Sequence, residues 1–157
     1  MDVDTIQAKN YIATKIINFI EKNCETESDI LSAWDLISKS PHITMEFIES
    51  NPDKPWVLKY VSENPNLTME FINNHPGTAW DDWDWNSISK NPNITHADIE
   101  GNPDKPWRWR FVSANPNITI DFVLKNIDKP WNLYFLSENP NLTMKFINEN
   151  IYPSKYS

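Results

Sequence analysis

The sequence predicts an all-α protein that folds as an α-solenoid, a stack of short helix pairs with a 24-residue period behind an N-terminal capping helix. Three observations predict this fold: a set of residues returns in register, each unit carries apolar stripes at helical spacing, and each unit is short. Helices of about two turns are not stable alone in water, so the units must stack to bury their apolar faces in a continuous core.

The chain begins with the segment that is expected to cap the stack. Residues 4–22 predict one longer helix, because Asp4 with Gln7 matches a capping box and isoleucines follow at helical spacing. These isoleucines are Ile6, Ile12, Ile16, Ile17 and Ile20. Residues 1–32 are therefore assigned to the N-terminal cap and its lead-in.

Five helical repeats follow over residues 33–150, and a serine marks each of them. A proline stands three residues after every serine, and a threonine stands six residues after it. The serines are Ser38, Ser62, Ser89, Ser113 and Ser137, at spacings of 24, 27, 24 and 24 residues. Self-similarity at a constant spacing indicates a repeat architecture.

The first helix of each pair is expected to start at an Asp-Lys-Pro-Trp stretch, at residues 53–56, 104–107 and 128–131. Aspartate can cap free amides, and proline is tolerated in the first turn of a helix. The Asn-Pro pairs that follow are expected to end this helix, because a proline disfavours helical geometry in the residue before it.

The second helix of each pair is expected to begin after the threonine, whose hydroxyl can serve as the N-cap. The residues one before and four after each threonine are apolar, as in a hydrophobic staple. These pairs are Ile43 with Ile48, Leu67 with Ile72, Ile94 with Ile99, Ile118 with Val123, and Leu142 with Ile147. A phenylalanine lies beside each staple except in the third copy, which carries Asp98.

The third repeat carries an insertion near residues 77–82, the one conspicuous break in register. Insertions in solenoids map to loops on one face, and such loops often bind partners. The candidate partner-binding residues here are Trp80, Asp81, Asp82 and Asp84. The alternative is a tolerated loop that only adjusts the stacking angle. Residues 151–157 are predicted to cap the last unit, so that residues 1–157 form a single domain.

A second candidate contact lies in the fourth repeat, where the protein's two arginines, Arg108 and Arg110, flank Trp109. Tryptophan and arginine dominate binding energetics at protein interfaces, so this stretch is a candidate hot spot. The second helices carry a mostly acidic row at variable positions, for which a solvated face is the simpler interpretation.

Composition limits the kinds of partner. The chain has 14 basic and 22 acidic side chains, a net charge of -8 and a pI near 4.8. Nucleic acids and anionic membranes are disfavoured as partners, because neutralising phosphates requires a surplus of Lys and Arg. A basic protein partner suits the chain better. The sequence shows no apolar leader and no membrane-length apolar run, which favours a soluble, cytoplasmic protein.

The sequence contains no catalytic constellation. Two glycines are too few for a phosphate-binding loop, and one cysteine, Cys24, allows neither an internal disulfide nor a thiolate cluster. The three histidines occupy three different repeat positions without metal-ligand spacing. The aspartates near residue 82 lack the glycine and terminal glutamate of a calcium loop. No catalytic residue, cofactor or metal is therefore predicted, and the chain is not expected to be an enzyme.

The units Asn-Pro-Asp-Lys-Pro-Trp and Ser-x-Asn-Pro-Asn-Ile/Leu-Thr resemble the tandem repeats of uncharacterised proteins from giant DNA viruses that infect amoebae. This resemblance covers roughly residues 33–150. The unit is more loosely similar to leucine-rich-repeat-variant proteins, which are helical arrays of the HEAT-like kind. The viral resemblance implies a protein that acts in the cytoplasm of an infected cell or is packaged in the virion, and it implies no catalytic residues.

The leading hypothesis is a non-catalytic scaffold that recruits a protein partner through one face of an extended helical-repeat surface. One alternative is a self-assembling structural component, because stacked repeats with imperfect caps can join end to end. The other is a helical-repeat nucleic-acid binder that uses tryptophans as stacking platforms. The acidic charge counts against that last alternative.

Overall fold

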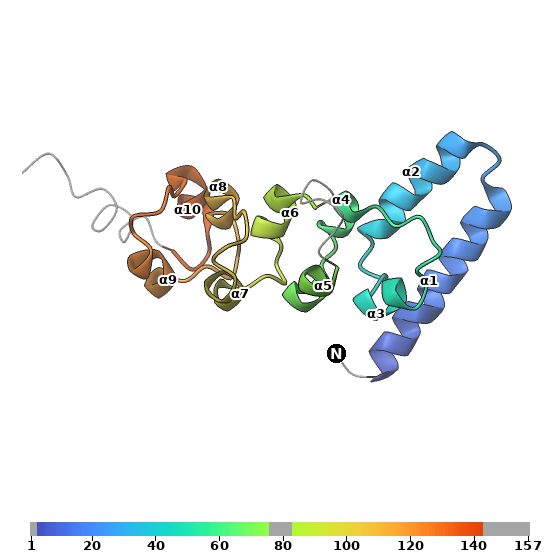
Figure 1. The fold of residues 1–157 in the computed structure, drawn as a ribbon, viewed down its shortest axis with the longest axis horizontal. Coiled ribbons are helices and arrows are strands. Elements are labelled where there is room, and N and C mark those ends of the chain that lie inside the picture. Colours follow the sequence, from blue (N-terminus) through green and yellow to red (C-terminus); the bar gives the residue numbers. More distant parts are fainter. Residues whose placement is uncertain (1–2, 76–82, 143–157) are drawn as a thin grey trace, which may run out of the picture. The chain divides into compact units, whose positions relative to one another are not determined.

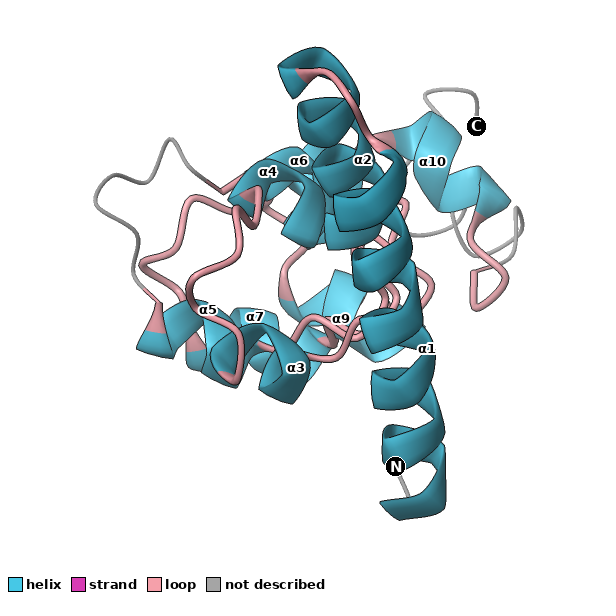
Figure 2. Ribbon diagram, turned by 90° about the vertical axis from the view of Figure 1, so that its right-hand side faces the viewer, coloured by secondary structure: helices cyan, strands magenta, loops and turns pink. Residues whose placement is uncertain are grey.

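The structure, a computed structural model, describes residues 3–75 and 83–142, and these residues form α-helices joined by turns and loops (Figures 1 and 2). No strand occurs within these ranges, so the prediction of an all-α fold is confirmed. The chain divides into two compact units, Met1–Asp84 and Trp85–Ser157, and each is described by itself. The single-domain organisation over residues 1–157 stays a prediction.

The first unit begins with a helical hairpin: α1 (Val3–Asn23) is followed, after a short loop, by α2 (Glu27–Ser38), which folds back beside it (Figure 1). Three short helices complete its described part: α3 (Met45–Glu49), α4 (Leu58–Val61) and α5 (Met69–Asn74). The second unit contains five described helices: α6 (Trp85–Lys90), α7 (His96–Gly101), α8 (Trp109–Val112), α9 (Ile120–Lys125) and α10 (Leu133–Glu138).

The long N-terminal helix differs in detail from the prediction. It begins at Val3, so Asp4 lies in its first turn and does not precede the helix as a capping residue. Of the predicted isoleucine stripe, Ile17 and Ile20 are buried, whereas Ile12 is 37% exposed. An ion pair joins the helix to the start of the second repeat, with Lys54 Nζ 2.7 Å from Glu21 Oε1, and the hydrogen bond that Lys54 donates to Glu21 raises the pKa of Lys54.

The prediction that Asp-Lys-Pro-Trp starts a helix is wrong. The helices α4, α8 and α10 begin two residues after the tryptophan of each stretch and contain only four or six residues. The reason is a tight turn centred on the proline, in which the tryptophan N–H donates to the lysine carbonyl at 2.8 Å in all three stretches. Proline's restricted φ suits this inverse γ-turn, and the turn delays the helix.

The prediction that Asn-Pro pairs end the first helices is met directly in two of the four described cases, because α4 and α8 already end at Val61 and Val112, three residues before the asparagine. The helices α6 and α10 stop immediately before an Asn-Pro pair. Each second helix begins after a threonine whose hydroxyl accepts the N–H of the residue three positions on, at Thr44, Thr68, Thr95 and Thr119. The predicted cap at Thr143 and the tail at residues 151–157 lie outside the described residues.

Buried asparagines connect successive copies of the repeat. Asn64 donates its side-chain amide to the carbonyl oxygens of Ser38, Ser40 and Ile43 at 3.0 to 3.1 Å. In the second unit, Asn115 repeats this pattern with the carbonyl oxygens of Ser89, Asn91 and Ile94 at 2.9 to 3.1 Å. Asn64 and Asn115 therefore satisfy backbone acceptors of the preceding copy within their own unit.

The marker serines form a second set of connections. The hydroxyl oxygens of Ser38, Ser62, Ser89 and Ser113 each accept a backbone N–H near the start of the next copy's first helix, at 2.9 to 3.1 Å. All four serines are fully buried. A larger side chain would not fit there, and an apolar one would leave a helix-start N–H without its acceptor, which explains why serine recurs at this position.

The core consists of the staple residues and an aromatic seam. The described staple pairs are buried throughout, from Ile43 to Val123, with exposures of 0 to 6%. Tryptophans of successive copies meet edge to face, with ring centroids 5.1 Å apart for Trp34 and Trp56 and 5.0 Å apart for Trp109 and Trp131. Aromatic pairs in this geometry add about 0.5 to 1.5 kcal/mol beyond their area burial.

Candidate functional site

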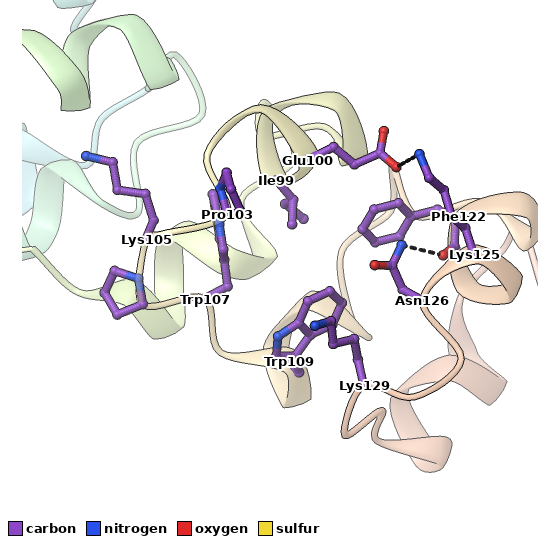
Figure 3. A pocket seen from close by; sticks show the side chains of 11 residues that line it. Ile99, Glu100, Pro103, Lys105, Trp107, Trp109, Phe122, Lys125, Asn126 and Lys129 are labelled. Carbon is purple, nitrogen blue, oxygen red and sulfur yellow. Dashed lines mark hydrogen bonds and ion pairs between the residues drawn. The ribbon is translucent and has the colours of Figure 1, made fainter.

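The second unit carries an open cleft of about 450 Å³ (Figure 3). Its walls come from successive copies: Ile99 and Glu100 belong to α7, Trp109 to α8, and Phe122 and Lys125 to α9. The connecting turns on either side of α8 complete the lining with prolines and lysines. A cleft of this size and mixed lining is typical of sites that hold a small molecule or a short peptide segment.

Packing behind the cleft holds its aromatic wall in place. The ring of Trp109 lies nearly parallel to that of Phe122, at 12° with centroids 6.2 Å apart, and meets the edge of Trp131. Trp107 is buried against the edge of Trp85, with centroids 5.2 Å apart, and its indole N–H donates to the Asn102 carbonyl at 2.7 Å. The wall is therefore built from rings whose orientation is set by several contacts each.

Lysines give the cleft a positive charge. Lys105, Lys125 and Lys129 are among its lining residues together with a single acid, Glu100, but the ammonium group of Lys105 points away from the other lining side chains (Figure 3). Lys125 Nζ pairs with Glu100 Oε1 at 2.6 Å, and Lys129 Nζ lies 5.6 Å from the centroid of the Trp109 ring. The local charge is thus opposite in sign to the net charge of -8 for the whole chain.

The cleft occurs in the copy whose aromatic seam is incomplete. In the other described copies a phenylalanine meets the following tryptophan edge to face, with centroids 6.2 Å apart for Phe47 and Trp56 and 5.9 Å apart for Phe122 and Trp131. In the third copy Asp98 stands in place of this phenylalanine and offers no ring to Trp107. Its carboxylate instead accepts the backbone N–H of Thr95 at 2.8 Å, which completes a capping box.

The structure places the predicted arginines beside this cleft without lining it. Arg108 and Arg110 are exposed, and neither forms an ion pair with a described carboxylate. The guanidinium of Arg110 lies 5.7 Å from the centroid of the Phe135 ring, and Arg108 donates its backbone N–H to Ser89 Oγ at 3.0 Å. Trp109, between them, faces the cleft. In the Trp-Arg-Trp-Arg stretch, the two tryptophan rings are therefore packed, whereas the two arginine side chains are exposed to solvent.

The predicted loop site is described only at Asp84. This residue belongs to the first unit and is half-buried, and its backbone N–H donates to Ser62 Oγ at 3.0 Å. Asp84 thereby occupies a regular repeat position, equivalent to that of Arg108. Trp80, Asp81 and Asp82 lie outside the described residues.

The described residues offer no grouped metal ligands: no cluster of three or more His, Cys, Asp or Glu occurs among them. A ring nitrogen of His75 lies 2.9 Å from the Phe71 carbonyl, and one of His96 lies 3.3 Å from the Asn117 carbonyl. Both rings therefore have partners in the backbone. None of the described helices combines the length and the apolar character that crossing a bilayer requires.

Sequence analysis did not identify the lysines of the cleft, although two signals for them were present. One is Asp98, which departs from the phenylalanine of the other copies. The other is Lys125, at a position where the preceding copies carry Ser50, Asn74 and Gly101. Each departure is a single residue, and the sequence alone does not indicate that Lys125 lies beside Glu100 of the preceding copy.

Comparison with models of known protein families found no match, and neither the curated proteins nor the solved structures contain a protein that matches this chain.

Proposed function

We propose that the chain is a non-catalytic α-solenoid with a 24-residue period and an N-terminal capping helix, which binds a protein partner through its surface. The observation that supports this proposal is the asparagine pattern: in each unit, a buried amide donates to carbonyls 21 to 26 residues earlier. Within each unit, such bonds join one copy to the preceding copy, as stacking requires. Repeat stacks of this kind present extended surfaces, which is how they recruit partners.

The proposed contacts are the exposed side chains that packing does not constrain. Arg108 and Arg110 are both exposed and carry two positive charges next to a packed aromatic cluster. Arginine beside aromatic residues is the composition that dominates binding energy at protein interfaces. Trp80, Asp81 and Asp82 remain part of the proposal on the grounds of the sequence alone.

The proposal is tested by capturing the tagged protein from host-cell cytosol with and without nuclease. We expect a discrete protein to remain bound after nuclease treatment. Alanine at both Arg108 and Arg110 should weaken its retention about tenfold or more without changing the helical circular dichroism or the melting temperature. Complete loss of bound protein after nuclease would contradict the scaffold function, and unchanged affinity of the double variant would remove the arginines from the contact.

A self-assembling structural component is a second candidate, and the N-terminal hairpin favours it. Of the ten large hydrophobic residues exposed in the described ranges, seven lie in α1 and α2. They are Val3, Tyr11, Ile12, Phe19, Ile30, Leu31 and Leu36. Concentrated exposed apolar area marks interaction sites.

Light scattering over a concentration series distinguishes this second candidate. If the chain assembles, its mean mass will rise steadily with concentration, and the variant Phe19→Glu, altered at a side chain that is 66% exposed, will rise less. A monomer mass that does not change with concentration would exclude self-assembly through α1 and α2.

A further inference from the structure

We propose that the cleft of the second unit binds an acidic peptide segment in which a carboxylate lies next to an aromatic or aliphatic side chain. This inference rests on the proposed function, because the segment would belong to the protein partner. It assigns that partner a chemistry and a place of contact, at Trp109, Phe122, Lys125 and Lys129 (Figure 3).

The apolar part of the peptide would pack against Trp109, the half-buried ring of the aromatic wall, and not against the buried Trp107. Trp109 is half-buried, so part of its ring remains accessible from the cleft, while its contacts with Phe122 and Trp131 hold it in one orientation. A ring that is already ordered loses little conformational freedom when a ligand covers it. Ile99 and the neighbouring prolines extend this surface.

The lysines would select a carboxylate. Lys129 Nζ lies over the Trp109 ring at 5.6 Å from its centroid, so positive charge and apolar surface are adjacent. Lys125 is paired with Glu100, but their side chains are 71% and 37% exposed. An exposed pair of this kind contributes little stability, and the ammonium group can donate to a second carboxylate at the same time.

The positive charge of the cleft distinguishes it from the rest of the chain, which is acidic. The net charge of -8 predicts a basic partner for the molecule as a whole, but a basic side chain in the cleft would be repelled by the ammonium groups of Lys125 and Lys129. A partner that suits both the acidic surface of the chain and the positive cleft would present an acidic segment to the cleft and basic groups elsewhere. Nucleic acid also carries negative charge, but the acidic remainder of the chain would repel its extended backbone.

Only the copy around residues 98–129 combines the required features in the described chain. Its seam carries Asp98 in place of phenylalanine, and the following second helix ends in Lys125. The equivalents of Lys125 in the preceding copies are neutral, namely Ser50, Asn74 and Gly101. Within the described residues, a ligand of this kind would therefore have one site.

A phage-displayed library of random short peptides, selected on the full chain, tests the inference. We expect the enriched peptides to contain Asp or Glu close to an aromatic or aliphatic residue. Binding of their synthetic forms should weaken about tenfold or more in the double variant Lys125→Glu and Lys129→Glu, because both positive charges are reversed. The matched control is Lys59→Glu with Lys90→Glu, which makes the same charge change at exposed lysines outside the cleft and should alter the affinity less than about twofold.

Three outcomes would overturn the inference. They are the enrichment of no peptide, equal loss of binding in both double variants, and displacement of the peptide by single-stranded oligonucleotides at equal concentration. Thermal melting of both variants shows that binding is compared between folded proteins. None of these outcomes bears on whether a nuclease-resistant protein partner is captured from cytosol, so failure of the cleft and failure of the scaffold function are separable.

Discussion

Replacing Asn115 by Asp is expected to lower the free energy of unfolding by about 3 to 5 kcal/mol, the usual cost of an uncompensated buried charge. The Asn115 side chain is fully buried, and its amide donates to three carbonyl oxygens of the preceding copy. Aspartate has the same shape but, when ionised, only accepts hydrogen bonds. The substitution would direct a carboxylate at three acceptors in a site without solvent.

The effect would be measured by urea denaturation with tryptophan fluorescence as the readout. Asn18→Asp is the matched control, because Asn18 is exposed on α1 and the same change there should cost less than about 0.5 kcal/mol. An Asn115→Asp protein as stable as the control would show that the amide does not join the two copies. The solenoid proposal would then lose the observation that supports it.

The helix ends show which parts of the fold a local pattern can predict. Threonine capping depends on neighbouring residues, so it can be predicted from the sequence, and the structure confirms it at Thr44, Thr68, Thr95 and Thr119. Termination directly before Asn-Pro is confirmed for α6 and α10. The predicted start of the first helix of each pair was wrong, because Lys-Pro-Trp forms a turn that competes with the helix. Asp and Pro favour both structures, so local preference alone could not decide between them.

The buried polar residues show where local pattern is insufficient. Asn64 and Asn115 were expected only to end a helix before their prolines, and Oδ1 of each accepts the N–H two residues on at 2.8 Å. Their donation to the preceding copy depends on how the copies pack, and no pattern within one copy specifies it. The sequence did show that these positions recur, and recurrence of a polar residue at a constant spacing is the signal that could have indicated a bond between copies.

The candidate site, too, was predictable where it depends on local composition and not where it depends on the packing of copies. Sequence analysis found Trp109 with its flanking arginines, because tryptophan and arginine stand out by composition. It did not find the cleft, whose charge comes from lysines that are unremarkable individually. A cleft is defined by the distance between elements, and for Glu100 and Lys125 that distance is known only once α7 and α9 are placed.

Replacing Trp107 by Ala is expected to lower the free energy of unfolding by about 3 to 5 kcal/mol, the usual range for a large buried ring. The Trp107 ring is 9% exposed and meets the edge of Trp85, and its N–H bonds to the Asn102 carbonyl. Since Asp98 supplies no ring on this seam, few neighbours can move into the space that the indole vacates. Urea denaturation would measure the loss, and a change below about 1 kcal/mol would contradict this account of the seam.

Trp107→Phe separates the role of Trp107 in stability from its role at the cleft. Phenylalanine keeps an aromatic edge against Trp85 but cannot donate to Asn102, so we expect it to cost about 1 kcal/mol for the hydrogen bond and somewhat more for lost packing. The protein should remain folded, with Trp109, Lys125 and Lys129 in place. Peptide binding by this variant should therefore stay close to that of the unchanged chain, because the proposed contacts lie on Trp109 and the lysines. Loss of binding without loss of folding would instead move the apolar contact from Trp109 to Trp107.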